Sequence, residues 1–225
     1  EVLALCERHE NLHAALGIYP VDAMAHAIDR EAWPHDWPPP EGFDVDAEIA
    51  FIESQADKLI AVGECGLDRY WLTEHDGEQE RVLRGLIDVA KRHDKPVILH
   101  SRRAEARVFE ILQEMEVEKA DFHCFTGKLK LARRIADAGY YLSIPPAVER
   151  DETFQRFARE LPLDRLLTET DSPYMGPVRG ERNEPANVPG AVSAMARARG
   201  IDPDEMRGAI AANFERLFGV SPTPA

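Results

Sequence analysis

Short apolar runs alternate along the chain with longer stretches in which apolar residues recur every three or four positions. Six runs have the length of a strand and are apolar almost throughout, which is typical of parallel strands buried on both faces. They are Leu12–Pro20, Leu59–Asp68, Pro96–Arg102, Ala120–Gly127, Tyr140–Ala147 and Arg165–Pro173. The stretches that predict helices are Glu78–His93, Ala104–Met115, Leu129–Ala138, Asn187–Gly200 and Asp202–Phe218. Repeated strand and helix units indicate an α/β fold with a parallel sheet.

Turn and cap residues support several of these boundaries. Gly139 follows the helix predicted at Leu129–Ala138, where a glycine with a left-handed backbone is expected. Asp202 is suited to cap the last helix together with Glu205, and Pro203 suits the first helical position. The proline-rich stretch Met24–Asp46 predicts a long loop, and Glu1–His9 reads as the end of a helix. We expect one domain over residues 1–225.

Four of the apolar runs contain a side chain that can bind a metal ion at or near the carboxyl end of the predicted strand. These side chains are Glu64, His100, His123 and Asp171. The active sites of (β/α)8 barrels lie at the carboxyl ends of the strands, so such a barrel would bring the four together. One buried histidine or carboxylate is usually structural. Four at four strand ends are costly to bury without a cation, which favours a metal site.

The mixed nitrogen and oxygen donors indicate which metals to expect. These donors suit Zn²⁺, Mn²⁺ or another divalent ion such as Mg²⁺. They suit Ca²⁺ poorly, because Ca²⁺ prefers a site made only of oxygen atoms. Such a site activates water and polarises a phosphoryl or acyl oxygen. Glu64 is suited to bridge two ions, and Asp171 to bind metal and accept the proton of the attacking water.

Several motifs resemble the successive signatures of TatD-type metal-dependent deoxyribonucleases. They are GECGLD at Gly63–Asp68, VILHSR at Val97–Arg102, FHCFTG at Phe122–Gly127, ETDSP at Glu169–Pro173 and RNEP at Arg182–Pro185. The resemblance runs from about Leu12 to Phe218. It implies a (β/α)8 barrel and a hydrolase that uses two metal ions to cleave DNA, often from the 3′ end. By the same resemblance, Glu64 is the bridging ligand, His100 and His123 are ligands, and Asp171 is the last ligand and the base.

The sequence departs from the family pattern in two places. The family opens with a strand that ends in a His-x-His pair, which this chain lacks, and six strands fall short of eight. We therefore expect the first one or two strands, with that pair, to precede Glu1. Tyr19 stands where the family usually has histidine, and its hydroxyl is a candidate contact for a phosphate.

Other residues are candidates for contacts with the substrate or with the ligands. Arg102, two positions after His100, is the leading candidate for a phosphate contact, and Asn183 is assigned to the substrate as well. Asp68 and Glu169 are expected to orient ligands, and Glu169 alternatively lies in the substrate cleft. Further basic residues that follow the strand ends are Arg103, Lys128, Lys130, Arg179 and Arg182.

Composition narrows the remaining classes of protein. The net charge of −14 argues against a protein that coats nucleic acid, although it allows an enzyme that grips single phosphates. Three cysteines, without the spacing of a zinc ribbon, favour a reducing cytoplasm, and no stretch reads as a membrane span. No obligate protein partner is indicated. Two alternatives stay open: an amidohydrolase or lactonase for a small molecule, and an inactive remnant that binds a partner.

Overall fold

The computed structural model describes residues 1–31, 33, 38–72 and 76–222 of the chain. The chain divides into two compact units, Glu1–Val117 and Glu118–Ala225. In both units parallel strands alternate with helices, which confirms the α/β class predicted from the sequence.

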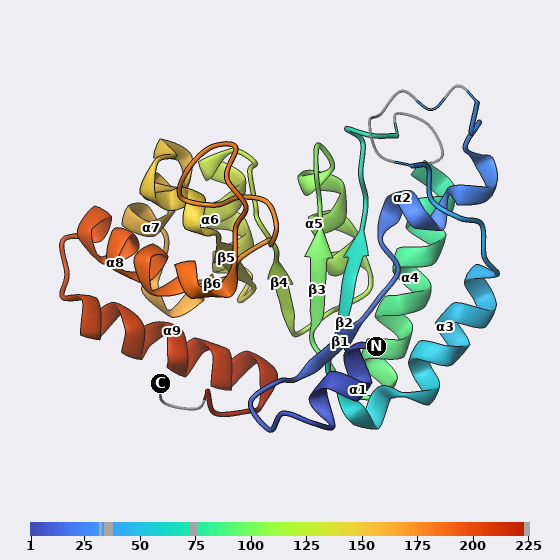
Figure 1. Ribbon diagram of the computed structural model, residues 1–225, viewed down its shortest axis with the longest axis horizontal. Coiled ribbons are helices and arrows are strands. Elements are labelled where there is room, and N and C mark those ends of the chain that lie inside the picture. Colours follow the sequence, from blue (N-terminus) through green and yellow to red (C-terminus); the bar gives the residue numbers. More distant parts are fainter. Residues whose placement is uncertain (32, 34–37, 73–75, 223–225) are drawn as a thin grey trace. The chain divides into compact units, whose positions relative to one another are not determined.

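The first unit is built on three parallel strands in the order β1-β2-β3. The strands are β1 (Ala14–Leu16), β2 (Leu59–Gly66) and β3 (Val97–His100). The helices are α1 (Val2–Cys6), α2 (Pro20–Ala23), α3 (Val45–Ser54), α4 (Asp76–Arg92) and α5 (Glu105–Glu114), with 3-10 turns η1 (Ala25–Ala27) and η2 (Ala56–Lys58). Helix α4 packs along β2, and α3 lies against α4 (Figure 1).

Two glycines allow the backbones in this sheet to approach each other closely. Gly66 at the end of β2 pairs with His100 at the end of β3, and a Cβ atom at Gly66 would lie 1.8 Å from the His100 carbonyl oxygen. A Cβ atom at Gly17 would lie 2.4 Å from the Glu64 carbonyl oxygen. No side chain fits at either distance, so glycine is required where the residues of the site emerge from the sheet.

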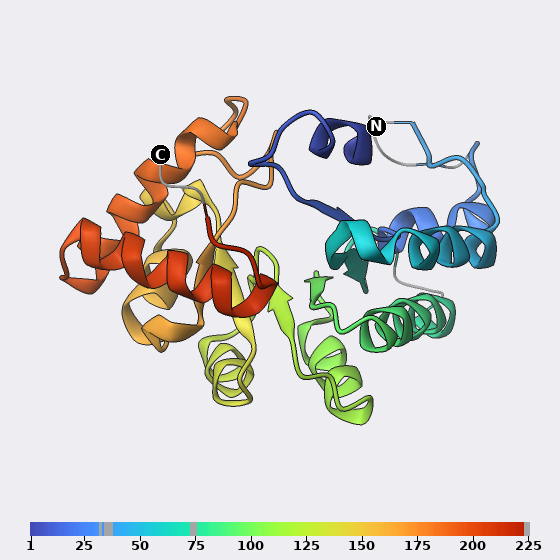
Figure 2. The ribbon, with the colours of Figure 1, turned by 90° about the horizontal axis from the view of Figure 1, so that it is seen from below.

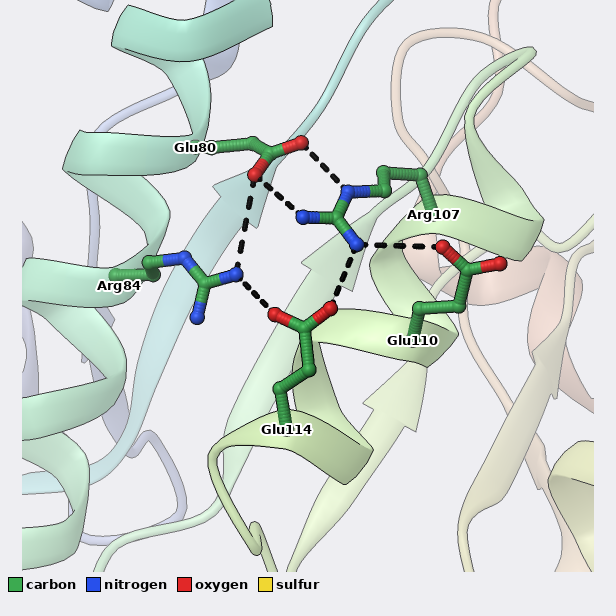
Figure 3. Close-up of polar contacts among 5 residues, drawn as sticks. All are labelled: Glu80, Arg84, Arg107, Glu110 and Glu114. Atoms are coloured by element: carbon green, nitrogen blue, oxygen red, sulfur yellow. Dashed lines mark hydrogen bonds and ion pairs between the residues drawn. The ribbon is translucent and has the colours of Figure 1, made fainter.

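An ion-pair network joins α4 to α5 on the surface of the first unit (Figure 3). The Arg107 guanidinium donates to both carboxylate oxygens of Glu80, at 2.6 and 2.8 Å, and to Glu114 at 2.7 Å. Arg84 also contacts Glu80 and Glu114, and Glu110 adds a further contact to Arg107 at 3.2 Å. The bidentate geometry fixes the spacing of the two helices, because both partners are held on two atoms.

The second unit repeats the pattern with parallel strands in the order β4-β5-β6. The strands are β4 (Ala120–Phe122), β5 (Tyr141–Ile144) and β6 (Leu166–Thr168). The helices are α6 (Leu129–Asp137), α7 (Glu152–Glu160), α8 (Val188–Arg199) and α9 (Pro203–Phe218), with 3-10 turns η3 (Pro146–Glu149), η4 (Leu163–Arg165) and η5 (Pro185–Asn187). Helix α8 packs between α7 and α9, and Figure 2 shows α9 running beside it.

The structure confirms most of the predicted elements. All six strands fall within the predicted apolar runs, and the five predicted helices correspond to α4, α5, α6, α8 and α9. Gly139 has φ 94° after α6, as predicted. Asp202 caps α9, and Pro203 lies in its first turn. The Asp202 side chain accepts from the backbone N–H of Asp204, whereas the prediction paired it with Glu205. Three helices, α2, α3 and α7, were not predicted. The single domain and the strands before Glu1 stay predictions.

Most of the predicted loop Met24–Asp46 is irregular where it is described, although it contains η1 and the first two residues of α3, Val45 and Asp46. Residues 32 and 34–37 of this loop lie outside the described residues. No helix in the described ranges is long and apolar enough to cross a membrane.

Candidate active site

His100, the last residue of β3, lies between two carboxylates of the first unit. Its Nδ1 atom is 2.9 Å from Glu64 Oε1, and its Nε2 atom is 2.8 Å from Asp68 Oδ2. The two carboxylates differ in exposure, because the Glu64 side chain is 32% exposed and the Asp68 side chain is 0% exposed. One imidazole therefore has a buried carboxylate on one nitrogen and a more accessible one on the other.

Asp68 is held in place from several directions. Its Oδ1 atom accepts hydrogen bonds from the backbone N–H groups of Tyr70 and Trp71, at 2.8 and 2.7 Å. Its own backbone N–H donates to the side chain of Gln79. Burial raises the pKa of Asp68, but the hydrogen bonds from His100 and from the two backbone groups outweigh burial and lower it. Asp68 is thus a fixed, ionised partner for His100.

The same contacts determine the charge preference of His100. Burial disfavours the protonated imidazole, but hydrogen bonds to Asp68 and Glu64 outweigh burial and raise the pKa of His100. The two carboxylates thus create a strongly cation-attracting environment around this ring.

Tyr19, a candidate substrate contact, packs against this arrangement. Its ring meets the His100 ring edge-on with centroids 4.9 Å apart, and its hydroxyl donates to Asp68 Oδ2 at 3.5 Å. Burial and the nearby carboxylates of Asp68 and Glu64 raise the pKa of Tyr19, so the hydroxyl stays neutral and can donate. Tyr19 also lines an open hollow of about 270 Å³, whose other lining residues are Gly17, Ile18, Asp22, Phe43 and Glu48.

In the second unit, His123 follows β4 and also lies between two carboxylates. Its Nδ1 atom contacts Glu169 Oε2, and its Nε2 atom is 3.5 Å from Asp171 Oδ1. The Glu169 side chain is 12% exposed and is held by the Ser143 hydroxyl, which donates to Oε2 at 2.9 Å. The Asp171 side chain is 31% exposed. The arrangement around His100 is therefore repeated around His123, with Glu169 as the more buried carboxylate.

Asp121 is an additional buried carboxylate that sequence analysis missed. It precedes Phe122 in β4, and its Oδ1 atom has no hydrogen-bond partner among the described residues. Burial, reinforced by the charge of Glu169, raises the pKa of Asp121 to about 7, against the opposing effects of His123 and Ser143. The available signal was a charged residue inside the mostly apolar run Ala120–Gly127, two positions before His123.

Asp171 has an uncommon backbone conformation. Its φ is 57°, in the left-handed region that aspartate tolerates better than most residues. Its carbonyl oxygen accepts from the Tyr174 backbone N–H at 2.7 Å, which closes a tight turn that begins three residues after Thr168, the end of β6. The chain therefore reverses direction at Asp171, the residue predicted to be the base.

Asn183 does not have the accessibility expected of a substrate contact. The residue is 1% exposed, and its side-chain nitrogen donates to the carbonyl oxygens of Thr170 and Tyr174, at 2.6 and 2.7 Å. Its side-chain oxygen accepts from the Glu184 backbone and the Asn187 side chain. Because the amide makes four hydrogen bonds inside the protein, Asn183 fixes the loop that follows Asp171. Its contact with the substrate stays a prediction.

Arg102 lies at the surface of the first unit, as a phosphate contact requires. Its guanidinium stacks on the ring of Tyr70, with Cζ 3.7 Å from the ring centroid. Sequence analysis did not single out Tyr70, although it lies two positions after Asp68, in the segment that Asp68 holds.

The imidazole nitrogens of His100 and His123 and the carboxylate oxygens beside them are atoms that can bind a divalent cation. Both histidines have carboxylate neighbours, and Glu169 Oε1 is buried without a hydrogen-bond partner among the described residues. A buried, unpartnered carboxylate oxygen is costly, and the charge of a nearby cation would offset part of that cost. The carboxylates instead contact the imidazoles directly, and no group of three or more His, Cys, Asp and Glu in the described ranges is spaced to hold a metal ion.

Comparison with known proteins identifies the family. The family model described as TatD related DNase matches residues 1–219. The chain belongs to this family. Human deoxyribonuclease TATDN3 is 35% identical over 223 residues, which cover 97% of this chain and 78% of that protein. The metal-dependent hydrolase YabD of Bacillus subtilis is 31% identical over 225 residues, covering 97% and 82% respectively.

A solved structure agrees with this assignment. The TatD homolog YJJV from Escherichia coli matches with a TM-score of 0.79 and 29% identity, covering 97% of this chain and 81% of that one. The family predicted from the motifs and its TIM-barrel-like α/β fold are therefore confirmed. The convergence of Glu64, His100, His123 and Asp171 stays a prediction.

Proposed function

We propose that this TatD family member is a metal-dependent hydrolase that cleaves phosphodiester bonds of DNA. The observation that carries the proposal is the repeated placement of a histidine between a buried and an accessible carboxylate. Family membership and the names of the relatives, a deoxyribonuclease and a metal-dependent hydrolase, support it. Nothing in the described residues favours an amidohydrolase or lactonase over this function.

The difference in exposure indicates which carboxylates bind metal. Asp68 and Glu169 are buried and held by other groups, so they are suited to orient the histidines. Glu64 and Asp171 are the accessible partners and are therefore the proposed metal ligands together with His100 and His123. In this assignment His100 uses Nδ1 and His123 uses Nε2. The mixed donors suit two ions of Mg²⁺, Mn²⁺ or Zn²⁺.

Each group has a defined task in the hydrolysis. Bound divalent ions would activate water and neutralise charge that develops on the phosphate. Asp171, with an accessible carboxylate, accepts the proton that the attacking water loses. Asp68 holds the tautomer and direction of the His100 ring, and Glu169 does the same for His123. Tyr19 keeps its proton, and its hydroxyl would turn from Asp68 to donate a hydrogen bond to a phosphate oxygen.

Three cysteines in the thiol form support a reducing, cytoplasmic setting for the enzyme.

The test is a comparison of substrates with the purified full-length protein. Release of nucleotides from single-stranded DNA is measured with Mg²⁺, Mn²⁺ or Zn²⁺ and with a chelator, beside a panel of lactones and amides. We expect metal-dependent release of nucleotides and no turnover of the panel. Turnover of a lactone or amide without release of nucleotides would replace this function by the small-molecule alternative.

A further inference from the structure

Two arginines stack on one aromatic ring in the first unit. Arg102 Cζ lies 3.7 Å from the centroid of the Tyr70 ring, and Arg103 Cζ lies 4.7 Å from the same centroid. Trp71 extends the aromatic surface, because its ring meets Tyr70 edge-on at 4.6 Å and lies 5.1 Å from Arg102 Cζ. Both arginines are exposed, and Tyr70 is 39% exposed. We refer to Tyr70, Arg102 and Arg103 as the arginine stack.

The arginine stack differs from the other arginines in its partners. Arg102 and Arg103 have no carboxylate within ion-pair distance in the part of the chain that the structure describes. Arginines that do form ion pairs are Arg81, Arg84, Arg92, Arg107, Arg133, Arg156, Arg165 and Arg207. In a chain of net charge −14, two adjacent guanidinium groups without a carboxylate are an unusual local excess of positive charge. They repel each other unless an anion lies between or beside them.

The position of both guanidinium groups over the ring leaves their hydrogen-bond donors available. A guanidinium that stacks on a ring uses its flat face, and its five N–H groups point outward in the plane. Those N–H groups match the two free oxygens of a phosphodiester, which a planar fork can bind at once. Neither guanidinium donates a hydrogen bond to another described residue. The ring therefore holds the donors in place without occupying them.

The backbone connects the arginine stack to His100. The Arg69 backbone N–H donates to the carbonyl oxygen of Arg102 at 3.0 Å, which joins the segment after β2 to the segment after β3. The Tyr70 backbone N–H donates to Asp68, which holds His100 on its other oxygen. The position of the stack relative to a proposed metal ligand is thus fixed by short hydrogen bonds within one unit.

We propose that the arginine stack binds a backbone phosphate of the DNA strand next to the phosphate that is cleaved. The proposal rests on the proposed function and adds a subsite to it. In the described residues the two guanidinium groups contact the rings of Tyr70 and Trp71 and not the His100 ring, which assigns the stack to a neighbouring phosphate. Tyr70 is a positioning residue in this subsite, since it preorganises Arg102 and Arg103.

The test compares variants of the full-length protein on two substrates. The variants are Tyr70→Leu, Tyr70→Phe, Arg102→Gln, Arg102→Lys and Arg103→Gln. Arg207→Gln is the matched control, because it removes the same charge from an exposed arginine of α9. The substrates are a single-stranded oligothymidine and bis(4-nitrophenyl) phosphate, a diester that has no neighbouring phosphate. Binding of a fluorescent oligothymidine is measured separately by anisotropy in a chelator, over a series of salt concentrations.

We expect Tyr70→Leu, Arg102→Gln and Arg103→Gln to raise Kd and KM for the oligothymidine about 10-fold, with kcat within about twofold. The salt slope of binding should fall by about 0.7 for each phosphate that the variant no longer binds. Tyr70→Phe should bind like the wild type because it keeps the ring, whereas Arg102→Lys should bind weakly although it keeps the charge. Turnover of the small diester should not change.

The outcomes separate this inference from the proposed function. If Tyr70→Leu and Arg102→Gln bind and cleave the oligothymidine like Arg207→Gln, the subsite is wrong and the nuclease activity stands. If these variants also slow the small diester, the stack contacts the cleaved phosphate and the inference is overturned. If the wild type cleaves neither substrate but binds oligothymidine through the stack, the proposed function fails and the subsite stands.

Discussion

The Nε2 atom of His100 lies 2.8 Å from Oδ2 of Asp68, a residue with a fully buried side chain. Because Asp68 is fixed by two backbone N–H groups, it is suited to accept a proton from Nε2 of His100. If a metal ion binds at Nδ1, on the side of Glu64, Nε2 keeps its proton and donates it to Asp68. The orientation of this one ring thus links the loop after β2 to the proposed metal ligands.

Asp68→Asn should weaken metal binding while the fold is kept. The asparagine oxygen can still accept from the two backbone groups, but its NH₂ group then faces His100 Nε2. That contact favours the tautomer with the proton on Nδ1, which cannot bind metal. We expect a loss of affinity of about 10- to 100-fold, measured by competition with a chelating dye. Asp88→Asn on α4 is the exposed control, and equal affinities of the two variants would show that Asp68 does not orient the ligand.

Glu169→Gln should have the corresponding effect at His123 in the second unit. Glu169 contacts His123 Nδ1 and is held by Ser143, so the amide would again change the ring proton. We expect metal affinity to fall about 10- to 100-fold and the melting temperature to stay close to that of the wild type. Ser143→Ala should give a weaker effect in the same direction. Wild-type metal affinity in Glu169→Gln would indicate that Glu169 lies in the substrate cleft, as its alternative assignment states.

Gly66→Ala should destabilise the first unit. A methyl group there would lie 1.8 Å from the carbonyl oxygen of His100, and φ at Gly66 is 151°. Relieving the contact requires the strands to separate, so we expect a loss of at least about 3 kcal/mol in the free energy of unfolding. Gly208→Ala is the matched control, because nothing lies within 4 Å of its added methyl group in α9, and it should stabilise by up to about 1 kcal/mol. Similar unfolding curves for both variants would contradict the close approach.

The network between α4 and α5 predicts a pH-dependent contribution to stability. Hydrogen bonds from Arg107 lower the pKa of Glu80 below its ordinary value of 4.5. A carboxylate with a lowered pKa stabilises the fold above the unfolded pKa, and this stabilisation is lost as the pH falls through the folded pKa. Glu80→Gln should therefore cost about 1 kcal/mol at neutral pH. Its difference from the wild type should begin to shrink below about pH 4.5 and should vanish only when the pH lies below the lowered pKa of folded Glu80.

Urea unfolding at a series of pH values measures this difference. Glu10→Gln, an exposed residue outside the network, is the control and should match the wild type throughout. A constant difference between Glu80→Gln and the wild type at every pH would mean that Glu80 acts through packing.

The strands could be predicted because they are buried on both faces and therefore apolar throughout. Glu64 and His100 were recognised for the same reason, since polar side chains that interrupt such runs need an explanation. The cap Asp151 and the buried Phe154, Phe157 and Ala158 of α7 carried a helical pattern that was overlooked. The exposure of side chains could not be predicted, because it depends on packing by residues far away in the sequence.

The same limit applies to the roles of individual site residues. Asn183 lies in a loop motif that suggested a substrate contact, but its four hydrogen bonds depend on the turn after Asp171. The pairing of each histidine with one buried and one accessible carboxylate also depends on the folded positions of side chains. The sequence predicted which side chains can bind metal, and only the structure shows which carboxylate contacts which histidine.

The central claim is that Asp171 acts as ligand and base in metal-dependent cleavage of DNA, and one measurement tests it most directly. Single-turnover hydrolysis of single-stranded DNA is followed with full-length wild type, Asp171→Asn and the exposed control Glu181→Gln, each at saturating Mn²⁺. We predict that the control matches the wild type and that Asp171→Asn is slower by about 10²- to 10⁴-fold. A rate for Asp171→Asn within a few fold of the wild type would contradict the account.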